Sequence, residues 1–371
     1  MTVRYTNFNI LFLLLLSMLF IGVLNTKVGS ISYLLPIVFI CIFFLFKFKT
    51  NQVNNKVLFY LGLMILSLYI SSIYQYIEYN TNNLYYIRFF GAQVFFFLLI
   101  IFFVNIEEFK KKYLEKFLLF IITVVFISVI IDYFLIKMGL ESYSLMYKEY
   151  ANSYKGKPLG VFGQFSITTS YIVFFYLLLK NYKINISKYE NMILFFMVTV
   201  VILLENSGTG YIAYMMLLYV MFSHYSKSKY MMFPMITIFM ILVLTNHVQK
   251  ISIDYLSFLY TFVENIIFNI YIHNINNVFD LLFGLDGNFN FPIDFGPLFL
   301  ISKVGLLYFI LYSFAIFYLI YKNRSRYFRM AIFVLLFANL HYSALFYPVM
   351  NIVLPTLLVI TLNKNKRYDC A

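Results

Sequence analysis

Long apolar stretches alternate with short polar breaks along almost the whole chain. Each stretch is about 12–22 residues long, and a helix needs about 20 residues to cross the roughly 30 Å hydrocarbon layer of a bilayer. A helix also satisfies its own backbone hydrogen bonds in lipid. The pattern therefore predicts an all-α polytopic membrane protein with twelve transmembrane helices, near residues 8–24, 31–46, 57–74, 87–104, 117–136, 159–179, 190–204, 210–222, 231–245, 297–320, 328–341 and 345–362.

The composition supports one membrane domain over residues 1–371. Hydrophobic residues make up 63% of the chain and charged residues 12%, which is too few charges to solvate a soluble globule of this size. The first apolar segment lacks a small-residue cleavage site, so it is predicted to remain as the first helix. Cys41 falls in the second span and Cys370 in the predicted inner tail, and no disulfide is expected.

Basic residues gather in every second predicted loop, and this bias orients the chain. With the N-terminus inside, one face holds twenty of the 28 Lys and Arg residues and five of the 15 acidic residues. Positive charge stays on the cytoplasmic side of a membrane, so both termini are predicted to lie inside. The twenty residues are Arg4, Lys47, Lys49, Lys56, Lys110, Lys111, Lys112, Lys116, Lys180, Lys183, Lys188, Lys227, Lys229, Lys322, Arg324, Arg326, Arg329, Lys364, Lys366 and Arg367.

The net charge of +13 follows from this topology. The basic residues occupy short loops next to the membrane, where they meet anionic headgroups. There is no basic stripe with interleaved aromatic residues on a soluble domain, as nucleic-acid binding would require. The chain is therefore expected to contact membrane lipids and no nucleic acid.

Two predicted outer loops, 137–158 and 246–296, are longer than a simple connection needs, and such loops are often functional. The second loop has apolar residues at helical spacing, which predicts an amphipathic helix at the membrane surface. A surface anchor and a lid over a substrate are both compatible with it. The apolar positions are Ile251, Tyr255, Phe258, Leu259, Phe262 and Ile266.

A polar turn from Glu205 to Gly210 joins two unusually short predicted spans. Two such helices do not reach the outer surface without thinning the bilayer, so the turn is expected to stop below it. Ser207 or Thr209 could cap the next helix, whose N-terminus would then offer N–H groups to an anion. The alternative is an ordinary helical hairpin with a capping Ser and a surface Glu.

Four basic residues on the predicted outer side are candidates for binding an anion. Lys155 and Lys157 precede a glycine-rich helix entrance, where their ammonium groups could neutralise a pyrophosphate or simply belong to a solvated basic loop. Arg88 begins the fourth span and either snorkels to the surface or binds an anion. Lys303 lies near mid-bilayer depth, where an ionisable group faces a cavity or a partner. Conceivable partners of Lys303 are Asp132, Glu205 and Asp294.

His341 ends the eleventh span on the predicted outer side and is either structural or a base. No spacing of His, Cys and Asp suggests a zinc site. The chain has no Walker loop and no Gly-x-Ser-x-Gly nucleophile elbow. We therefore expect no metal and no cofactor.

Three motifs resemble those of the O-antigen and capsule polysaccharide polymerases (Wzy-type), which are related to the O-antigen ligases. Lys157-Pro158-Leu159-Gly160-Val161-Phe162-Gly163 is similar to the family's basic-Pro-x-Gly-aromatic entrance to a middle helix. Glu205-Asn206-Ser207-Gly208-Thr209-Gly210-Tyr211 is similar to its Ser-Arg-Thr-Gly-aromatic hairpin. Leu282-Phe283-Gly284, with Asp294-Phe295-Gly296 and Gly305-Leu306, is similar to its closing motif. The family commonly has Arg where this chain has Gly208 and Lys157.

The resemblance implies a glycosyltransferase that needs neither metal nor nucleotide. It would transfer a glycan from undecaprenyl pyrophosphate to a lipid-linked repeat unit at the outer face of the bacterial cytoplasmic membrane, with other polysaccharide-assembly proteins as possible partners. The implied base is Glu205, Asp294 or His341. Arg88, Lys155, Lys157 and Lys303, with Ser207 and Thr209, would bind the substrate.

Two other functions remain open from the sequence. A flippase or other transporter of lipid-linked oligosaccharides should show an internal repeat and polar residues in many spans, and neither is visible. An O-antigen ligase would share the chemistry of the polymerase. A glycosyltransferase with acidic residues in its first outer loop is disfavoured, because residues 25–30 are few and contain no acid.

Overall fold

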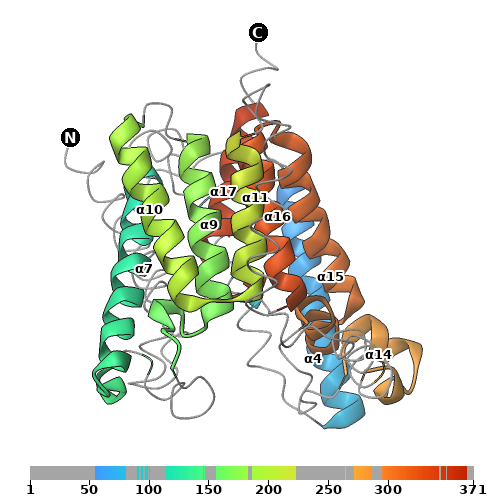
Figure 1. Cartoon of the computed structure of the whole chain (residues 1–371). Coiled ribbons are helices and arrows are strands. Elements are labelled where there is room, and N and C mark those ends of the chain that lie inside the picture. The colour runs from blue at the N-terminus through green and yellow to red at the C-terminus, as the bar shows by residue number, and fades with distance from the viewer. Residues whose placement is uncertain are drawn as a thin grey trace, which may run out of the picture.

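A computed structural model describes residues 55–80, several positions between 90 and 100, residues 114–144, 146, 156–182, 186–222, 264, 271–285, 295–341, 344–347 and 349–365. In this part of the chain the regular structure is entirely helical (Figure 1). The α-helices are α4 (Asn55–Tyr79), α7 (Leu114–Lys137), α9 (Phe165–Tyr182), α10 (Lys188–Glu205), α11 (Gly208–Phe222), α14 (Val278–Phe283), α15 (Gly296–Lys322), α16 (Arg326–His341) and α17 (Met350–Asn365). Four 3-10 turns complete them: η1 (Glu141–Tyr143), η2 (Gly160–Phe162), η4 (Ile272–Asn274) and η5 (Ala344–Phe346).

The all-helical prediction is confirmed for the described residues. Predicted spans 57–74, 117–136, 159–179, 190–204, 210–222, 297–320, 328–341 and 345–362 coincide with α4, α7, α9, α10, α11, α15, α16 and α17. The described positions of span 87–104 are also helical. The spans near 8–24, 31–46 and 231–245 lie outside the described residues, as does most of the amphipathic stretch 251–266.

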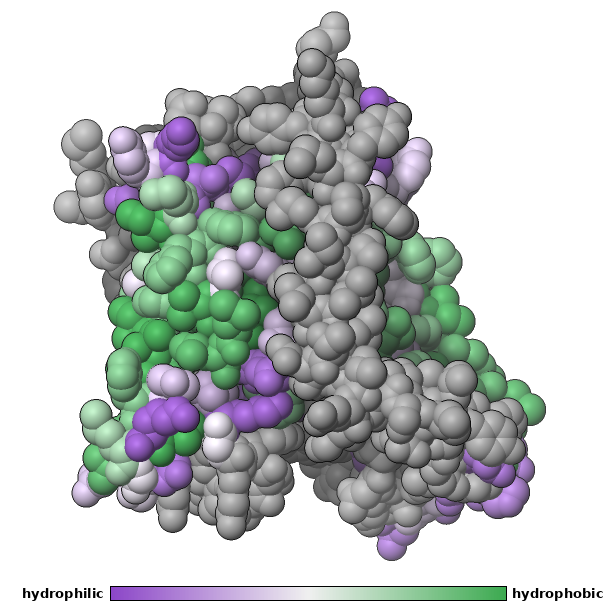
Figure 2. Space-filling view, in the orientation of Figure 1, coloured by the Kyte–Doolittle hydropathy of each residue, from purple (hydrophilic) through white to green (hydrophobic). Residues whose placement is uncertain are grey.

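The surfaces of these helices are compatible with a membrane protein. Among the described residues, α4, α7 and α15 are long and apolar enough to cross a bilayer. Large apolar side chains point outward along them, including Phe59 on α4 at 70% exposure and Phe317 on α15 at 64%. Soluble monomers rarely expose such continuous apolar surface. Figure 2 shows a hydrophobic band on this face with hydrophilic residues toward its two ends.

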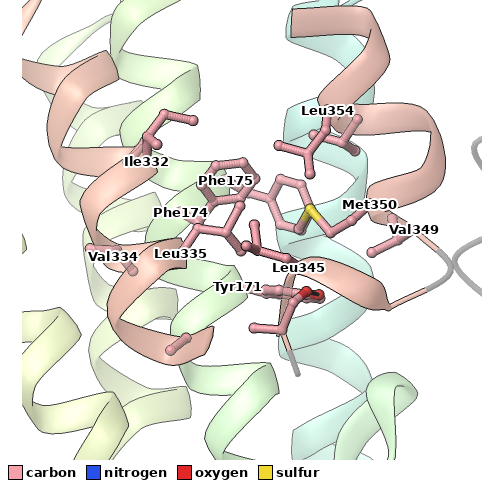
Figure 3. Packing of buried hydrophobic residues seen from close by; sticks show 14 of the residues in the cluster. Tyr171, Phe174, Phe175, Ile332, Val334, Leu335, Leu345, Val349, Met350 and Leu354 are labelled. Atoms are coloured by element: carbon pink, nitrogen blue, oxygen red, sulfur yellow. Dashed lines mark hydrogen bonds between the residues drawn. The ribbon is translucent and has the colours of Figure 1, made fainter. Parts of the chain in front are cut away.

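Helix α9 is the centre of the bundle. Every side chain from Ser166 to Leu179 is buried, and α7, α10, α11 and α16 pack around the helix. Figure 3 shows Phe174 and Phe175 of α9 between Leu335 of α16 and Leu354 of α17. A helix that is buried on all sides is typical of the interior of a large or membrane-embedded bundle.

The helix ends form two groups. Hydrogen bonds from Gly160 to Asp132, from Lys157 to Asn206 and from Tyr171 to Ala344 bring together the end of α7, the start of α9, the α10–α11 turn and the start of α17. We call this the hairpin end. At the other end, which we call the basic end, Lys180 of α9 donates to Asn191 of α10, and α15 and α17 finish together. Helices α7 and α10 therefore run toward the hairpin end, and α9 and α17 run away from it. The full topology, and that the hairpin end faces outward, stay predictions.

Helix α15 is broken at Gly305. This residue has φ 84° and ψ 165°, so the helix stops and restarts one residue later. The break exposes carbonyl groups that a continuous helix would bond, and other segments bond them instead. The amide of Leu285 donates to the Ser302 carbonyl at 2.8 Å, and Gln75 Nε2 donates to the Lys303 carbonyl at 3.0 Å. The break is therefore a docking point for α4 and for the segment that contains α14.

Replacing Gly305 with Ala is expected to destabilise the protein. A positive φ is strained for any residue with a Cβ, and the added atom would overlap the backbone carbonyl of Leu282. The cost is about 1–3 kcal/mol, seen as a lower melting temperature of the detergent-solubilised protein in size-exclusion chromatography after heating.

Gly62→Ala is the matched control, because nothing lies within 4 Å of a Cβ at that position of α4. Its melting temperature should be unchanged or slightly higher, since Ala favours a helix over Gly. Equal stability of the two variants would contradict the docking role of the break.

Candidate functional site

The turn between α10 and α11 has its shape fixed by two polar residues. Asn206 follows Glu205 in the left-handed region, with φ 46°, and ends α10. The hydroxyl of Ser207 then accepts a hydrogen bond from the amide of Gly210 at 2.9 Å, which caps α11. The sequence offered Ser207 or Thr209 as the cap. Ser207 caps α11, and Thr209 is buried in its first turn.

The turn is packed tightly onto the start of α9. The hydroxyls of Thr169 and Ser207 lie 2.9 Å apart, and a Cβ at Gly210 would come within 2.6 Å of Thr169. Figure 1 shows the turn set back from the ends of α7 and α4 on the same side of the molecule. That the turn also stops short of the membrane surface stays a prediction.

Glu205 is completely buried at this turn, with 0% exposure. Neither carboxylate oxygen has a hydrogen-bond partner among the described residues. Asp132 and Lys157 are the charged groups that act on it electrostatically. A surface Glu, the alternative drawn from the sequence, is therefore wrong. A buried carboxylate without hydrogen bonds is costly, and such a group inside a membrane protein usually has a function.

Asp132 positions the segment that leads into α9. Its two carboxylate oxygens accept hydrogen bonds from the Ser144 hydroxyl and from the Gly160 amide, each at 2.9 Å. Gly160 has φ 62°, and a Cβ there would lie 2.8 Å from Val129. Sequence reasoning named Asp132 only as a conceivable partner of Lys303. Its place near the end of an apolar helix, where a charge is costly, was the available signal.

Lys157 joins this segment to the hairpin. Its Nζ donates to the backbone carbonyl of Asn206 at 3.2 Å and lies 4.6 Å from the centre of the Phe165 ring. The hydrogen bond to Asn206 is exposed. Lys157 therefore places a positive charge beside the turn that contains Glu205, through a contact that an incoming anion could replace.

Lys303 belongs to a second polar cluster, on α15 next to the break at Gly305. Lys303 is 2% exposed, and α15 packs there against α4 and α14. Gln75 connects the elements, since its Nε2 also donates to the Phe283 carbonyl at 3.0 Å. Lys303 is therefore buried, as expected, and its depth in the bilayer stays a prediction.

Asp280 fixes the segment before the break. Tyr74 and Tyr79 of α4 donate to one of its oxygens, and the amides of Asn276 and Asn277 donate to the other at 2.8 and 3.1 Å. Burial alone would raise the pKa of this carboxyl, but these hydrogen bonds outweigh burial and hold the pKa below its usual value. Asp280 is thus a structural anchor that sequence reasoning missed.

An apolar groove runs along the bundle between α11, α15 and α16. Its volume is about 910 Å³, and its lining extends from Pro297 and Asn339 at the hairpin end to Phe317 and Met330. Twenty residues of helix, from Pro297 to Phe317, span about 30 Å. Helix α11 connects the hairpin to the groove, because it begins in the hairpin and contributes Met216 to the lining of the groove.

Of the predicted site residues, the structure brings together Lys157, Glu205, Ser207 and Thr209, and it assigns Lys303 to the other cluster. Arg88, Lys155 and Asp294 lie outside the described residues. His341 ends α16, and its side chain is outside the described part. Within the described segments, no group of three His, Cys, Asp or Glu residues could hold a metal ion.

No family model, no curated protein and no solved structure matches the chain. The function must therefore be argued from the chain's own residues and motifs.

Proposed function

We propose that this protein is a polymerase of surface polysaccharide repeat units. It transfers a glycan from undecaprenyl pyrophosphate to a lipid-linked repeat unit at the outer face of the bacterial cytoplasmic membrane. One observation supports the proposal most: a buried carboxylate, Glu205, lies beside the ammonium group of Lys157 in a set-back hairpin whose second helix also lines a long apolar groove.

The proposed reaction needs a base and a positive charge. The acceptor hydroxyl oxygen attacks the anomeric carbon of the donor glycan, and the bond from that carbon to the pyrophosphate oxygen breaks. Undecaprenyl pyrophosphate leaves with the bonding electrons, and the hydroxyl proton passes to the base. Glu205 is our candidate base, since a carboxylate can take this proton. Lys157 is our candidate for the positive charge that stabilises the negative charge developing on the leaving group.

Access to Glu205 requires movement, because the side chain is fully buried in the described conformation. The hydrogen bond from Lys157 to the Asn206 carbonyl, between the entry segment and the hairpin, is exposed. A pyrophosphate offers Lys157 a stronger, charged partner. We propose that binding of the donor draws Lys157 away from Asn206 and opens the hairpin to the acceptor, as closing and opening segments do in many enzymes.

The apolar groove suits the hydrocarbon chain of the proposed lipid-linked substrate. An undecaprenyl chain is a long hydrocarbon that must stay in the bilayer while its pyrophosphate reaches the hairpin end. The groove extends along α15 from Pro297 to Phe317, and we propose that it follows the height of the bilayer and opens to lipid. Asn339 lies at its hairpin end, where the pyrophosphate would emerge, while most of the remaining lining is apolar.

A transporter is the second candidate, because transporters bind ions and substrates at interrupted helices such as α15. In those proteins the unwound carbonyls coordinate the cargo. Here the Ser302 and Lys303 carbonyls accept hydrogen bonds from Leu285 and Gln75. The break is therefore better explained as a structural joint, which favours the polymerase. A ligase would use the same chemistry with a different acceptor.

A strain that lacks the protein is expected to accumulate single lipid-linked repeat units in place of long chains. The units should still reach the outer leaflet, because polymerisation follows export. Gel electrophoresis of extracted glycolipids measures chain length, and digestion of intact spheroplasts with a glycosidase reports the leaflet. Units trapped on the cytoplasmic leaflet would instead identify a flippase.

Glu205→Gln should lower polymer output by about 100-fold or more, because it keeps the shape and removes the base. Glu190→Gln is the matched control, since Glu190 lies in the first turn of the same helix at the basic end. The strain complemented with Glu190→Gln should make normal chains. Normal chains from Glu205→Gln, at equal protein level, would remove Glu205 from the chemistry.

A further inference from the structure

A second apolar crevice lies at the basic end of the molecule. It has a volume of about 460 Å³ and is bounded by α4, α15 and α17. Its walls include Val57 of α4, Phe314 of α15 and Leu358 of α17. Helices α4 and α15 are both long and apolar enough to cross a bilayer, and a crevice between two such helices can open toward lipid.

Two ammonium groups lie at one end of this crevice. Lys56 in the first turn of α4 lines it directly. Lys322, in the last turn of α15, has its Nζ 5.9 Å from the ring centre of Tyr318 and 5.7 Å from that of Tyr321, and both rings line the crevice. The crevice is therefore positive at the membrane boundary and apolar further in.

We propose that this crevice is a binding site for an anionic phospholipid such as phosphatidylglycerol. The phosphate would lie between Lys56 and Lys322, and an acyl chain would enter between α4 and α15. The charge pattern selects this ligand, because a zwitterionic lipid has an ammonium group of its own and gains less from two lysines. Tyrosines at the boundary suit the same position, where an amphipathic ring meets headgroups.

The wall of the crevice supports an acyl chain as the occupant. The Tyr60 hydroxyl donates to the Leu311 carbonyl, so this tyrosine presents its ring to the crevice. Phe97 and Leu362 add apolar surface. The crevice adjoins the groove beside α16, since Phe314 and Phe317 line both, but its two lysines lie at the basic end, away from the hairpin. The proposal does not depend on whether the protein is a polymerase.

The test uses the full-length protein in detergent, with dioleoyl phosphatidylglycerol as the probe and dioleoyl phosphatidylcholine as the comparison. Phosphatidylglycerol should raise the melting temperature and appear as a bound adduct in native mass spectrometry, more than phosphatidylcholine does. Lys56→Gln and Lys322→Gln should each weaken that binding about fivefold, as expected for a lysine near a lipid surface. Both side chains are exposed, so the variants should fold normally.

Lys188→Gln is the matched control, because it removes the same charge from an exposed position of α10 at the basic end and outside the crevice. It should bind phosphatidylglycerol like the unaltered protein. Glycerol phosphate, which has the headgroup charge without acyl chains, should leave the melting temperature unchanged.

Three results would overturn the proposal. The first is an equal response of the unaltered protein to both lipids. The second is a loss with Lys188→Gln as large as the loss with Lys56→Gln and Lys322→Gln, which would indicate a general surface charge effect. The third is a stabilisation by glycerol phosphate equal to that by the lipid.

Discussion

The burial of α9 on all sides is the constraint on which the rest of the structure depends. From Ser166 to Leu179 this helix contacts other protein segments at every position, so α7, α10, α11 and α16 are arranged around it. At its first turn, Thr169 meets Ser207 of the hairpin, and the preceding segment is bonded to Asp132. The position of Glu205 and Lys157 thus follows from how neighbouring helices cover α9.

The polar groups inside the bundle divide into two kinds. Asp132, Asp280 and Gln75 have hydrogen bonds that join segments far apart in the chain, and they stabilise turns and a broken helix. Glu205 differs, since both of its carboxylate oxygens lack a hydrogen-bond partner among the described residues. A protein retains a buried carboxylate of this sort at a cost, which is the physical reason for assigning chemistry to Glu205 before the bonded acids.

The sequence predicted the helices well and the polar clusters only in part. Apolar runs of sufficient length must be helical in lipid, so α4, α7 and α15 followed from hydropathy alone. The hairpin motif predicted a cap by Ser207 or Thr209, and Ser207 is the cap; a functional site at Glu205 stays a prediction. The role of Asp132 and the break at Gly305 depend on contacts 28 residues apart and on the backbone of Leu282, which no local pattern encodes. The division of Lys157 and Lys303 between two clusters likewise depends on tertiary packing.

The proposed site requires that the hairpin with Glu205 faces the outside of the cell. Labelling at the two ends of α10 tests this orientation directly. Gly208 and Lys188 are exposed at opposite ends of this helix and its turn. In a chain without Cys41 and Cys370, Gly208→Cys should react with a membrane-impermeant thiol reagent in intact cells, and Lys188→Cys should react only after permeabilisation. The reverse labelling pattern would show that the hairpin faces the cytoplasm, and it would contradict the proposed site.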